Sequence, residues 1–312
     1  MPTDSKKYQL VTRSDMDGLV CAVLLRQKGL IDEIIFVHPK DVQDGKIEIS
    51  ENHITTNLPY SENAHLVFDH HYSETLRIHG SKKNHVIDPY APSTSRVVYD
   101  YFGGKKAFPD LPDEMMIAVD KADAAHFTME DVVNPQGWEL LSFIMDARTG
   151  LGRFKDFRIS NYNLMMNLID YCQSHPISEI LQLPDVKERV DLYFYHQDRF
   201  KEQLKRCSVI YGNLVVLDLL NEDTIYPGNR FMIYVLFQDC SVSMYIMWGF
   251  KKQNTVFAVG KSIFNRTAKF NIGELMLKYG GGGHSGAGTC QIDNNQADQI
   301  RQDLIDEIVR SA

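Results

Sequence analysis

The stretch "YQLVTRSDMDGLVCAVLLRQKG" (residues 8–29) decides the fold. Residues 8–12 are typical of a buried β-strand, and residues 17–29 carry apolar side chains at helical spacing and close on Gly29. A strand that passes directly into a helix is the repeating unit of α/β domains. We therefore expect a sheet whose faces are covered by helices.

The same alternation continues downstream. Further strands are predicted at 33–38, 64–69 and 84–88, and further helices at 91–104 and 111–125. Strands that are separated by helices form mainly parallel sheets. The first domain is thus predicted to be α/β with a mainly parallel sheet.

The rest of the chain has a different character. Residues 175–207 become charged and helical from Asp185 onward, which predicts a connecting helix. Apolar segments typical of β-strands follow at 208–220, 230–237, 241–250 and 255–264. Because 312 residues are many for one core, we expect a domain at 1–175, a connecting helix at 176–206 and a smaller α+β domain at 207–312.

Composition and charge narrow the function classes. The net charge of −8 and the pI near 5.8 disfavour a protein that coats long nucleic acid, because that requires a basic face. The five cysteines have no CxxC spacing, so neither a disulfide framework nor a structural zinc site is predicted. No apolar run approaches the roughly 20 residues that span a bilayer, and the N-terminus lacks the apolar core of a secretory signal. We expect a cytoplasmic protein.

Two pairs of acidic residues lie beside the ends of predicted helices or strands. Asp15 and Asp17 lie two residues apart between the first strand and its helix, so both carboxylates could face one site, or they could form only a helix cap. Asp120 and Asp123 lie one helical turn apart, either near the interior or on a solvated helix face.

The segment "HLVFDHHYSE" (65–74) adds two imidazoles. Asp69, His70 and His71 follow a predicted core strand, where they could bind a metal or form a hydrogen-bonded turn. A mixture of carboxylate and imidazole suits Mn²⁺, Fe²⁺ or Zn²⁺ better than Mg²⁺ or Ca²⁺. Together with the acidic groups, these residues could furnish a two-metal site that activates a water molecule towards phosphorus.

A glycine-rich segment, "KYGGGGHSGAGT" (278–289), offers a phosphate-binding loop. Bare amides can approach a phosphate closely and His284 can add a donor, although a plain flexible turn is the alternative. The preceding "KSIFNRT" (261–267) adds candidate anion ligands, namely Lys261, Ser262, Asn265 and Arg266.

The ordered set "SDMDG", "FDHH", "AVDKAD" and "GGGGHSGAG" resembles the DHH phosphoesterase superfamily. That superfamily includes RecJ-type nucleases, nanoRNases, cyclic-dinucleotide phosphodiesterases and exopolyphosphatase-like proteins. The similarity covers nearly the whole chain. It implies a Rossmann-like catalytic domain, a connecting helix and a DHH-associated C-terminal domain, with substrate held between the domains.

The resemblance also implies roles for individual residues. Asp15, Asp17, His70 and Asp120 are similar to the family's metal ligands, with Asp123 as a neighbour, Asp69 as a support for His70, and His71 as the contact to the scissile phosphate. Arg266, Ser262 and the run Gly281, Gly282, Gly283 and His284 resemble the part that grips a phosphate or the substrate's terminal group. The implied cofactor is Mn²⁺, as one or two ions, with Mg²⁺ or another divalent cation as the alternative.

Two positions depart from the family pattern. Arg13 stands where relatives place a His or Asp ligand, and Asn57 stands where they place an Asp that bridges two metals. A neutral amide is a poor bridge, whereas Arg13 could contact a phosphate as a fixed cation. A basic segment with Arg148, Arg153, Lys155 and Arg158 could be a solvated loop, or it could add positive charge to the site.

The sequence predicts a metal-dependent phosphohydrolase that cleaves phosphodiester or phosphoanhydride bonds of short oligonucleotides, dinucleotides or polyphosphate. The alternative is a non-hydrolytic phosphate- or nucleotide-binding DHH protein, which Asn57 and Arg13 favour. A processive RecJ-like exonuclease is disfavoured by the acidic pI. The expected partner is a small phosphorylated substrate or a short oligonucleotide, with no long nucleic acid and no membrane. A homodimer is one candidate state of assembly.

Overall fold

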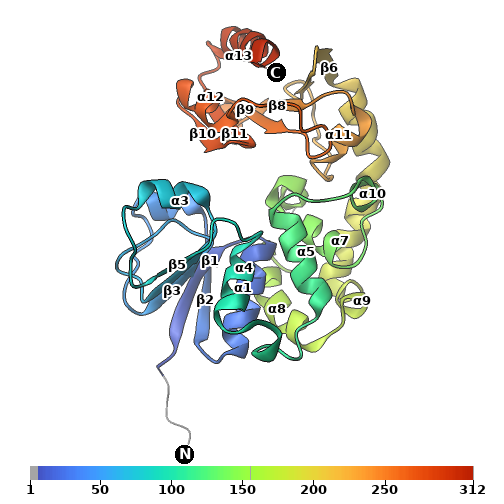
Figure 1. Cartoon of the computed structure of the whole chain (residues 1–312). Helices are drawn as coiled ribbons and strands as arrows, with labels where there is room; N and C mark the ends of the chain where they lie inside the picture. The colour runs from blue at the N-terminus through green and yellow to red at the C-terminus, as the bar shows by residue number, and fades with distance from the viewer. Residues whose placement is uncertain (1–5, 155, 312) are drawn as a thin grey trace, which may run out of the picture. The chain divides into compact units, whose positions relative to one another are not determined.

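The computed structural model describes residues 6–154 and 156–311, and Lys155 of the basic segment lies outside them. The chain divides into two compact units (Figure 1). The first unit comprises the residues up to Phe127 together with Pro135–Leu192. The second comprises Thr128–Asn134 and the residues from Tyr193 onward. None of the described helices is both long and apolar enough to cross a membrane.

The first unit is built on a five-stranded sheet in the order β2-β1-β3-β4-β5. Its strands are β1 (Tyr8–Arg13), β2 (Ile31–Val37), β3 (His53–Thr56), β4 (Leu66–Asp69) and β5 (His85–Ile87). Every neighbouring pair is parallel, which confirms the predicted α/β class. The chain turns to one side of β1 to form β2 and to the other side to form β3. Open α/β sheets bind ligands beyond the carboxyl ends of the strands at such a switch point.

The helices of this unit pack beside the sheet and against one another. They are α1 (Met16–Gln27), α2 (Pro39–Gln43), α3 (Tyr72–Arg77), α4 (Thr94–Tyr101), α5 (Asp113–Asp123), α7 (Gly137–Met145), α8 (Asn161–Ser174) and α9 (Ile177–Ile180), with 3-10 turns η1 (Gly104–Lys106), η2 (Ala147–Thr149) and η3 (Leu151–Arg153). Helix α1 contacts α4, α5 and α8, and these helices lie together beside the sheet in Figure 1. Residues 16–25 of α1 are all buried, as expected of a helix that is apolar on most of its surface.

Gly18 fixes the junction between β1 and α1. A Cβ atom at this position would lie 1.9 Å from the carbonyl oxygen of Arg13 and 2.8 Å from Thr12 Oγ1. Only glycine lets the first turn of α1 pass this close to the end of the strand. The side chains of Asp15 and Asp17 are therefore held at the carboxyl edge of the sheet.

The second unit contains a six-stranded mixed sheet in the order β10-β11-β9-β8-β7-β6. Its elements are α6 (Met129–Val133), β6 (Ser208–Tyr211), β7 (Leu214–Asp218), α11 (Met232–Leu236), β8 (Val242–Trp248), η4 (Phe250–Lys252), β9 (Thr255–Lys261), α12 (Ile272–Lys278), β10 (Gly282–His284), β11 (Ala287–Ile292) and α13 (Ala297–Ser311). Only β7 and β8 pair in parallel. Helix α10 (Pro184–Arg206) runs from the first unit into the second, where a connecting helix is predicted.

One predicted strand is wrong. Residues 230–237 were expected to form a β-strand, but Met232–Leu236 form helix α11. A short apolar run carries no period that separates a strand from a buried helical turn. The tertiary environment decides here, because the Tyr234 hydroxyl hydrogen-bonds Ser243 of β8 at 2.7 Å and the Asn229 side chain accepts the amide of Phe231 at 2.9 Å.

Candidate metal centre and active site

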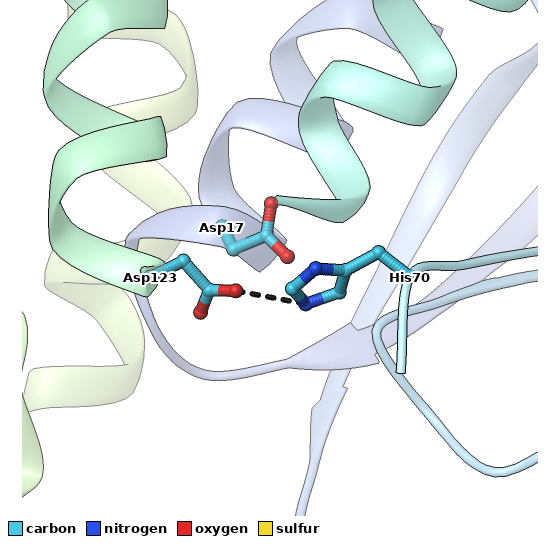
Figure 2. Close-up of side chains that lie close together, drawn as sticks. All are labelled: Asp17, His70 and Asp123. Carbon is cyan, nitrogen blue, oxygen red and sulfur yellow. Dashed lines mark ion pairs between the residues drawn. The ribbon is translucent and has the colours of Figure 1, made fainter. Parts of the chain in front are cut away.

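Three segments of the first unit bring a histidine and two carboxylates together (Figure 2). Asp17 lies in the first turn of α1, His70 follows β4, and Asp123 is the last residue of α5. One ligand atom from each of these residues lies within 4.8 Å of the others. This donor set, two carboxylate oxygens and one imidazole nitrogen, suits a divalent transition-metal ion.

His70 is held in the orientation of a metal ligand. Its Nδ1 donates to the carbonyl oxygen of Ala91 at 3.1 Å, which directs Nε2 towards Asp123 Oδ2 at 2.8 Å. Histidines that bind metals through one nitrogen commonly donate the other N–H to a backbone carbonyl. His70 Nε2 is buried and, apart from this ion pair, makes no hydrogen bond within the described part of the chain.

The protonation of His70 also fits a cation site. Burial lowers its pKa, but the hydrogen bond and charge of Asp123 and the charge of Asp17 outweigh burial and raise the pKa to about 9. The two acids thus hold a proton between themselves and the imidazole. A divalent cation bound to deprotonated ligands takes the place of such a proton, so the residues fit a metal.

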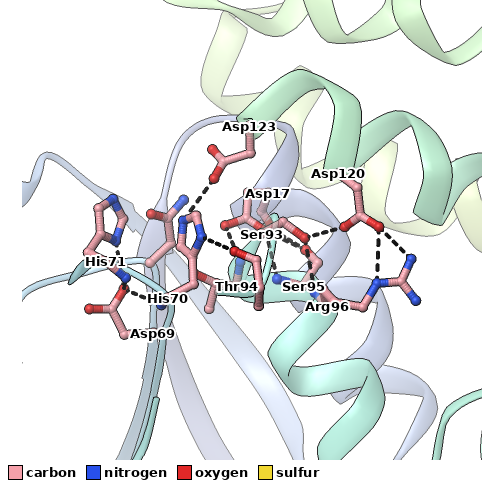
Figure 3. Close-up of polar contacts among 12 residues, drawn as sticks. Asp17, Asp69, His70, His71, Ser93, Thr94, Ser95, Arg96, Asp120 and Asp123 are labelled. Atoms are coloured by element: carbon pink, nitrogen blue, oxygen red, sulfur yellow. Dashed lines mark hydrogen bonds and ion pairs between the residues drawn. The ribbon is translucent and has the colours of Figure 1, made fainter. Parts of the chain in front are cut away.

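Asp17 is bound to the start of helix α4. Its carboxylate accepts the amides of Thr94 at 3.0 Å and Ser95 at 2.7 Å, and the Ser95 hydroxyl at 2.6 Å (Figure 3). The N-terminus of a helix favours a negative charge at this place. Burial raises the pKa of Asp17 to about 7, and the charges of Asp123 and Asp15 add to the effect. Hydrogen bonds therefore hold the Asp17 carboxylate in place, and a bound cation would stabilise its charged form.

Asp69 and His71 form a second pair. Asp69 is fully buried, and its Oδ1 accepts His71 Nδ1–H at 2.7 Å and the amide of His70 at 2.8 Å. Burial lowers the pKa of His71, but the hydrogen bond and charge of Asp69 outweigh it and raise the pKa. The ring is thereby oriented and kept able to carry a positive charge.

The structure places Asp120 outside the group around His70. Its carboxylate accepts a hydrogen bond from Ser93 Oγ at 2.7 Å and two from Arg96, from Nε at 3.0 Å and from Nη2 at 2.5 Å (Figure 3). Asp123, which the resemblance implied only as a neighbour, lies beside His70 instead. The residues of α4 that hold the two carboxylates were expected from the sequence only as a helix start, and the serines and threonine at residues 93–95 were the available signal.

Asp15 is held by groups of the chain itself. Its Oδ2 forms an ion pair with Arg13 Nε at 2.9 Å, and its Oδ1 accepts the Gly18 amide at 3.0 Å and Asn57 Nδ2 at 3.3 Å. Burial raises the pKa of Asp15, whereas Arg13 lowers it. Asn57 directly follows β3 with a left-handed φ of 55°, a conformation that asparagine tolerates better than most residues. Its Oδ1 is buried without a hydrogen-bond partner among the described residues.

The arginines of the basic segment have different ionic partners. Arg148 in η2 hydrogen-bonds Asp146 at 2.7 Å, and it lies near enough to Asp15 and Asp123 for their charges to help raise its pKa. Arg158 forms an ion pair with Asp185 at 3.4 Å. Arg148 is thus the arginine of this segment whose charge acts on the site acids.

Within the glycine-rich segment of the second unit, Gly282–His284 form β10. A Cβ on Gly281 would lie 2.2 Å from the carbonyl oxygen of Thr289, and one on Gly283, where φ is +155°, would lie 2.3 Å from that of Ala287. These glycines are required by close backbone packing. Around Gly282, by contrast, no atom lies within 4 Å of an added Cβ. His284, the last residue of β10, is exposed.

Ser262 is buried, and its Oγ accepts the amide of Asn265 at 2.9 Å, which stabilises a turn after β9. Arg266 donates from Nε to the carbonyl oxygen of Ile263 at 3.0 Å. Ser262 therefore has a structural role in this turn, while the side chain of Arg266 lies at the surface.

Comparisons with solved structures show what the chain is similar to. A pGpG-specific phosphodiesterase, PggH from Vibrio cholerae, is 60% identical, with a TM-score of 0.85, over 98% of this chain and 100% of that chain. CDC45 from Entamoeba histolytica shares the fold at 9% identity and a TM-score of 0.52, over 99% of this chain and 96% of that chain. RecJ from Thermus thermophilus with Mn²⁺ has 13% identity and a TM-score of 0.49, over 98% of this chain and 52% of that chain. No family model and no curated protein matches the chain.

Proposed function

Because the chain belongs to the DHH phosphoesterase superfamily, we propose that it hydrolyses the linear dinucleotide pGpG to two molecules of GMP. The chain is a phosphohydrolase of small substrates. The choice of pGpG rests on the relative that is 60% identical over 98% of this chain and that acts specifically on pGpG. The observation that carries the chemistry is the convergence of Asp17, His70 and Asp123 at the carboxyl edge of the sheet.

The proposed cofactor is Mn²⁺, held by Asp17, His70 and Asp123. Mixed carboxylate and imidazole ligands favour it over Mg²⁺ and Ca²⁺. When bound, the ion would polarise a phosphoryl oxygen and lower the pKa of a water molecule, so that hydroxide is present near neutral pH. The hydrogen bonds of His70 to Ala91 and of Asp17 to Thr94 and Ser95 fix the directions of two of these ligands.

His71 is proposed to contact the scissile phosphate. Its ring is held by Asp69, and its raised pKa keeps it able to donate to a phosphoryl oxygen as an imidazolium. Asp69 is a positioning residue, because it is fully buried and acts through His71. In the second unit, Arg266, His284 and the amide of Gly282 are proposed to bind the substrate's terminal phosphate or nucleoside.

The reaction balances without a further reactant. The oxygen of water bonds to the phosphorus of the internal phosphodiester, the bond from that phosphorus to the 3′ oxygen breaks, and a proton from water passes to the 3′ oxygen. One GMP then carries the former 5′ phosphate and the other carries the former internal phosphate. The net charge of −8 supports a small substrate rather than long nucleic acid, and the protein is proposed to act in the cytoplasm.

The test compares substrates at equal concentration with added Mn²⁺. Purified protein is incubated with pGpG, pApA, cyclic diguanylate and polyphosphate, and the products are separated by ion-exchange chromatography. We expect GMP from pGpG at a rate well above that of the other three. Faster turnover of the cyclic dinucleotide or of polyphosphate would reject pGpG as the substrate.

A further inference from the structure

We infer that the site binds a single divalent cation, and that the guanidinium of Arg13, anchored on Asp15, takes the place of a second cation and contacts the scissile phosphate. This inference rests on the proposed function. It assigns Arg13 as a catalytic residue and Asp15 as its positioning residue. It is supported by the contacts of Asp15, the neutral amide of Asn57, the unengaged terminal nitrogens of Arg13 among the described residues, and the balance of charges.

Asp15 has little capacity left for a metal. A carboxylate offers about four acceptor positions. Oδ1 accepts hydrogen bonds from the Gly18 amide at 3.0 Å and from Asn57 Nδ2 at 3.3 Å, and Oδ2 forms the ion pair with Arg13 Nε at 2.9 Å. A cation bound here would have to displace an arginine that already neutralises the carboxylate.

Asn57 cannot hold two cations together. Paired ions in such sites lie about 3.5–4 Å apart and stabilise both the attacking and the leaving oxygen. Their mutual repulsion requires a negatively charged ligand between them, and Asn57 supplies a neutral amide. Its donation to Asp15 also directs the carbonyl oxygen away from that carboxylate.

Arg13 is arranged to receive a phosphate. It ends strand β1, and its side chain is 37% exposed. Only Nε is engaged with Asp15, and neither terminal nitrogen has a hydrogen-bond partner among the residues that the structure describes. Two parallel N–H donors on a planar fork match two phosphoryl oxygens.

The charges balance with one ion. Asp15, Asp17 and Asp123 carry one negative charge each, and one guanidinium with one divalent cation neutralises them. Arg148 also lies near Asp15 and Asp123, although its own charge is paired with Asp146. The incoming phosphodiester therefore meets acids that are already neutralised without a second metal.

The deciding experiment counts bound ions. Metal-stripped full-length protein is equilibrated with Mn²⁺ by dialysis, and its electron paramagnetic resonance spectrum is recorded. We expect one Mn²⁺ per chain and the spectrum of an isolated ion. Two ions with an exchange-coupled spectrum would overturn the inference but leave metal-dependent hydrolysis intact. No bound Mn²⁺ would overturn both the inference and the proposed metal site.

Substitution of Arg13 tests its role separately. Arg13→Met should still bind one Mn²⁺, while KM for pGpG rises roughly 10- to 100-fold through loss of charge-assisted hydrogen bonds. Arg13→Lys should recover only part of the affinity, because lysine keeps the charge but lacks the planar fork. An unchanged KM in Arg13→Met with its Mn²⁺ retained would refute the assignment.

A matched control and a gain of function complete the design. Arg26→Met removes another Arg–Asp ion pair of the first unit, that with Asp170, and should change neither KM nor the Mn²⁺ count. The double variant Arg13→Met/Asn57→Asp restores a carboxylate and removes the competing cation, so it should bind a second Mn²⁺ with an exchange-coupled spectrum. If this variant binds one ion and its melting shows that it is folded, the assignment of Arg13 and Asn57 to the second position fails.

Discussion

Gly18 lies where the first turn of α1 comes closest to the end of β1. An alanine methyl there would stand 1.9 Å from the Arg13 carbonyl oxygen, so helix and strand would have to separate. We expect Gly18→Ala to lower the free energy of unfolding by about 1–3 kcal/mol and to reduce the affinity for Mn²⁺, because Asp17 moves with the helix. Thermal denaturation and Mn²⁺ titration measure the two effects.

Gly286→Ala is the matched control for that prediction, since no atom lies within 4 Å of a Cβ added there. It should leave the melting temperature nearly unchanged. Equal melting temperatures for Gly18→Ala and the wild type would contradict the role given to Gly18.

Asp120 and Asp123 offer a second test at the scale of single residues. Asp123→Ala removes a carboxylate that lies 2.8 Å from His70 Nε2, so it should weaken Mn²⁺ binding by roughly 10-fold or more. Asp120→Ala breaks the contact with Arg96 and should leave Mn²⁺ affinity within a few-fold of wild type. Calorimetric titration of both variants decides the matter, and the reverse ranking would show that Asp120 is the ligand.

The sequence predicted these residues unevenly. Acids and histidines at strand ends, with their order along the chain, were enough to single out Asp17 and His70. Asp120 and Asp123 lie one helical turn apart, and Asp120 is held away from His70 by Ser93, the N-cap of α4, and by Arg96 of α4. These two residues are 27 and 24 residues from Asp120 in the chain. A contact between residues so far apart in the chain leaves no periodic pattern in the sequence. The sequence prediction of Asp120 as a ligand therefore rested on the family resemblance alone.

At the scale of elements, the end of α10 carries a pH-dependent contact. Glu222 accepts hydrogen bonds from both terminal nitrogens of Arg206, at 2.8 and 2.6 Å, and from Gln203 Nε2 at 2.6 Å. These hydrogen bonds lower the pKa of Glu222 from 4.5 to about 2. The folded pKa lies below the unfolded one, so the contact stabilises the fold above about pH 4.5. That stabilisation is lost as the pH falls towards about 2.

Glu222→Gln should therefore melt at a lower temperature than the wild type at pH 7, with a difference that stays nearly constant down to about pH 5 and then shrinks as the pH is lowered to 3. Melting followed by circular dichroism across this range provides the check. A difference that stayed constant with pH would show that the charge of Glu222 does not contribute.

Gly281, just before strand β10, and Gly282, its first residue, allow structural and binding effects to be separated. Gly281→Ala should destabilise the second unit, because its Cβ would lie 2.2 Å from the Thr289 carbonyl oxygen. Gly282→Ala has open space and should fold normally. If the Gly282 amide approaches the substrate, the added methyl should still raise KM for pGpG several-fold. A normal KM in Gly282→Ala would remove this loop from the substrate site.

The elements themselves were largely predictable. Apolar runs beside helical patterns located four strands of the parallel sheet, because buried parallel strands are apolar along their length. The same reasoning failed at α11, where an equally apolar run packs as a helical turn. The glycine run was predicted as a phosphate loop, yet Gly281 and Gly283 are also required for backbone packing, which only coordinates reveal.

At the scale of the whole molecule, charge and motif order determined the class of protein. The acidic balance disfavoured long nucleic acid, and the set of motifs across 312 residues identified the superfamily. Composition could not select a substrate, since no single aromatic or polar residue marks a base-binding site. The substrate proposal came from a relative that is 60% identical over 98% of the chain.

Titration of metal-stripped protein with Mn²⁺, while GMP release from pGpG is followed, asks directly whether hydrolysis depends on an ion at His70. We expect no release without the cation, a rate that saturates as one site fills, and no recovery in the His70→Ala variant. GMP release at the wild-type rate in excess chelator, or in His70→Ala, would contradict this dependence.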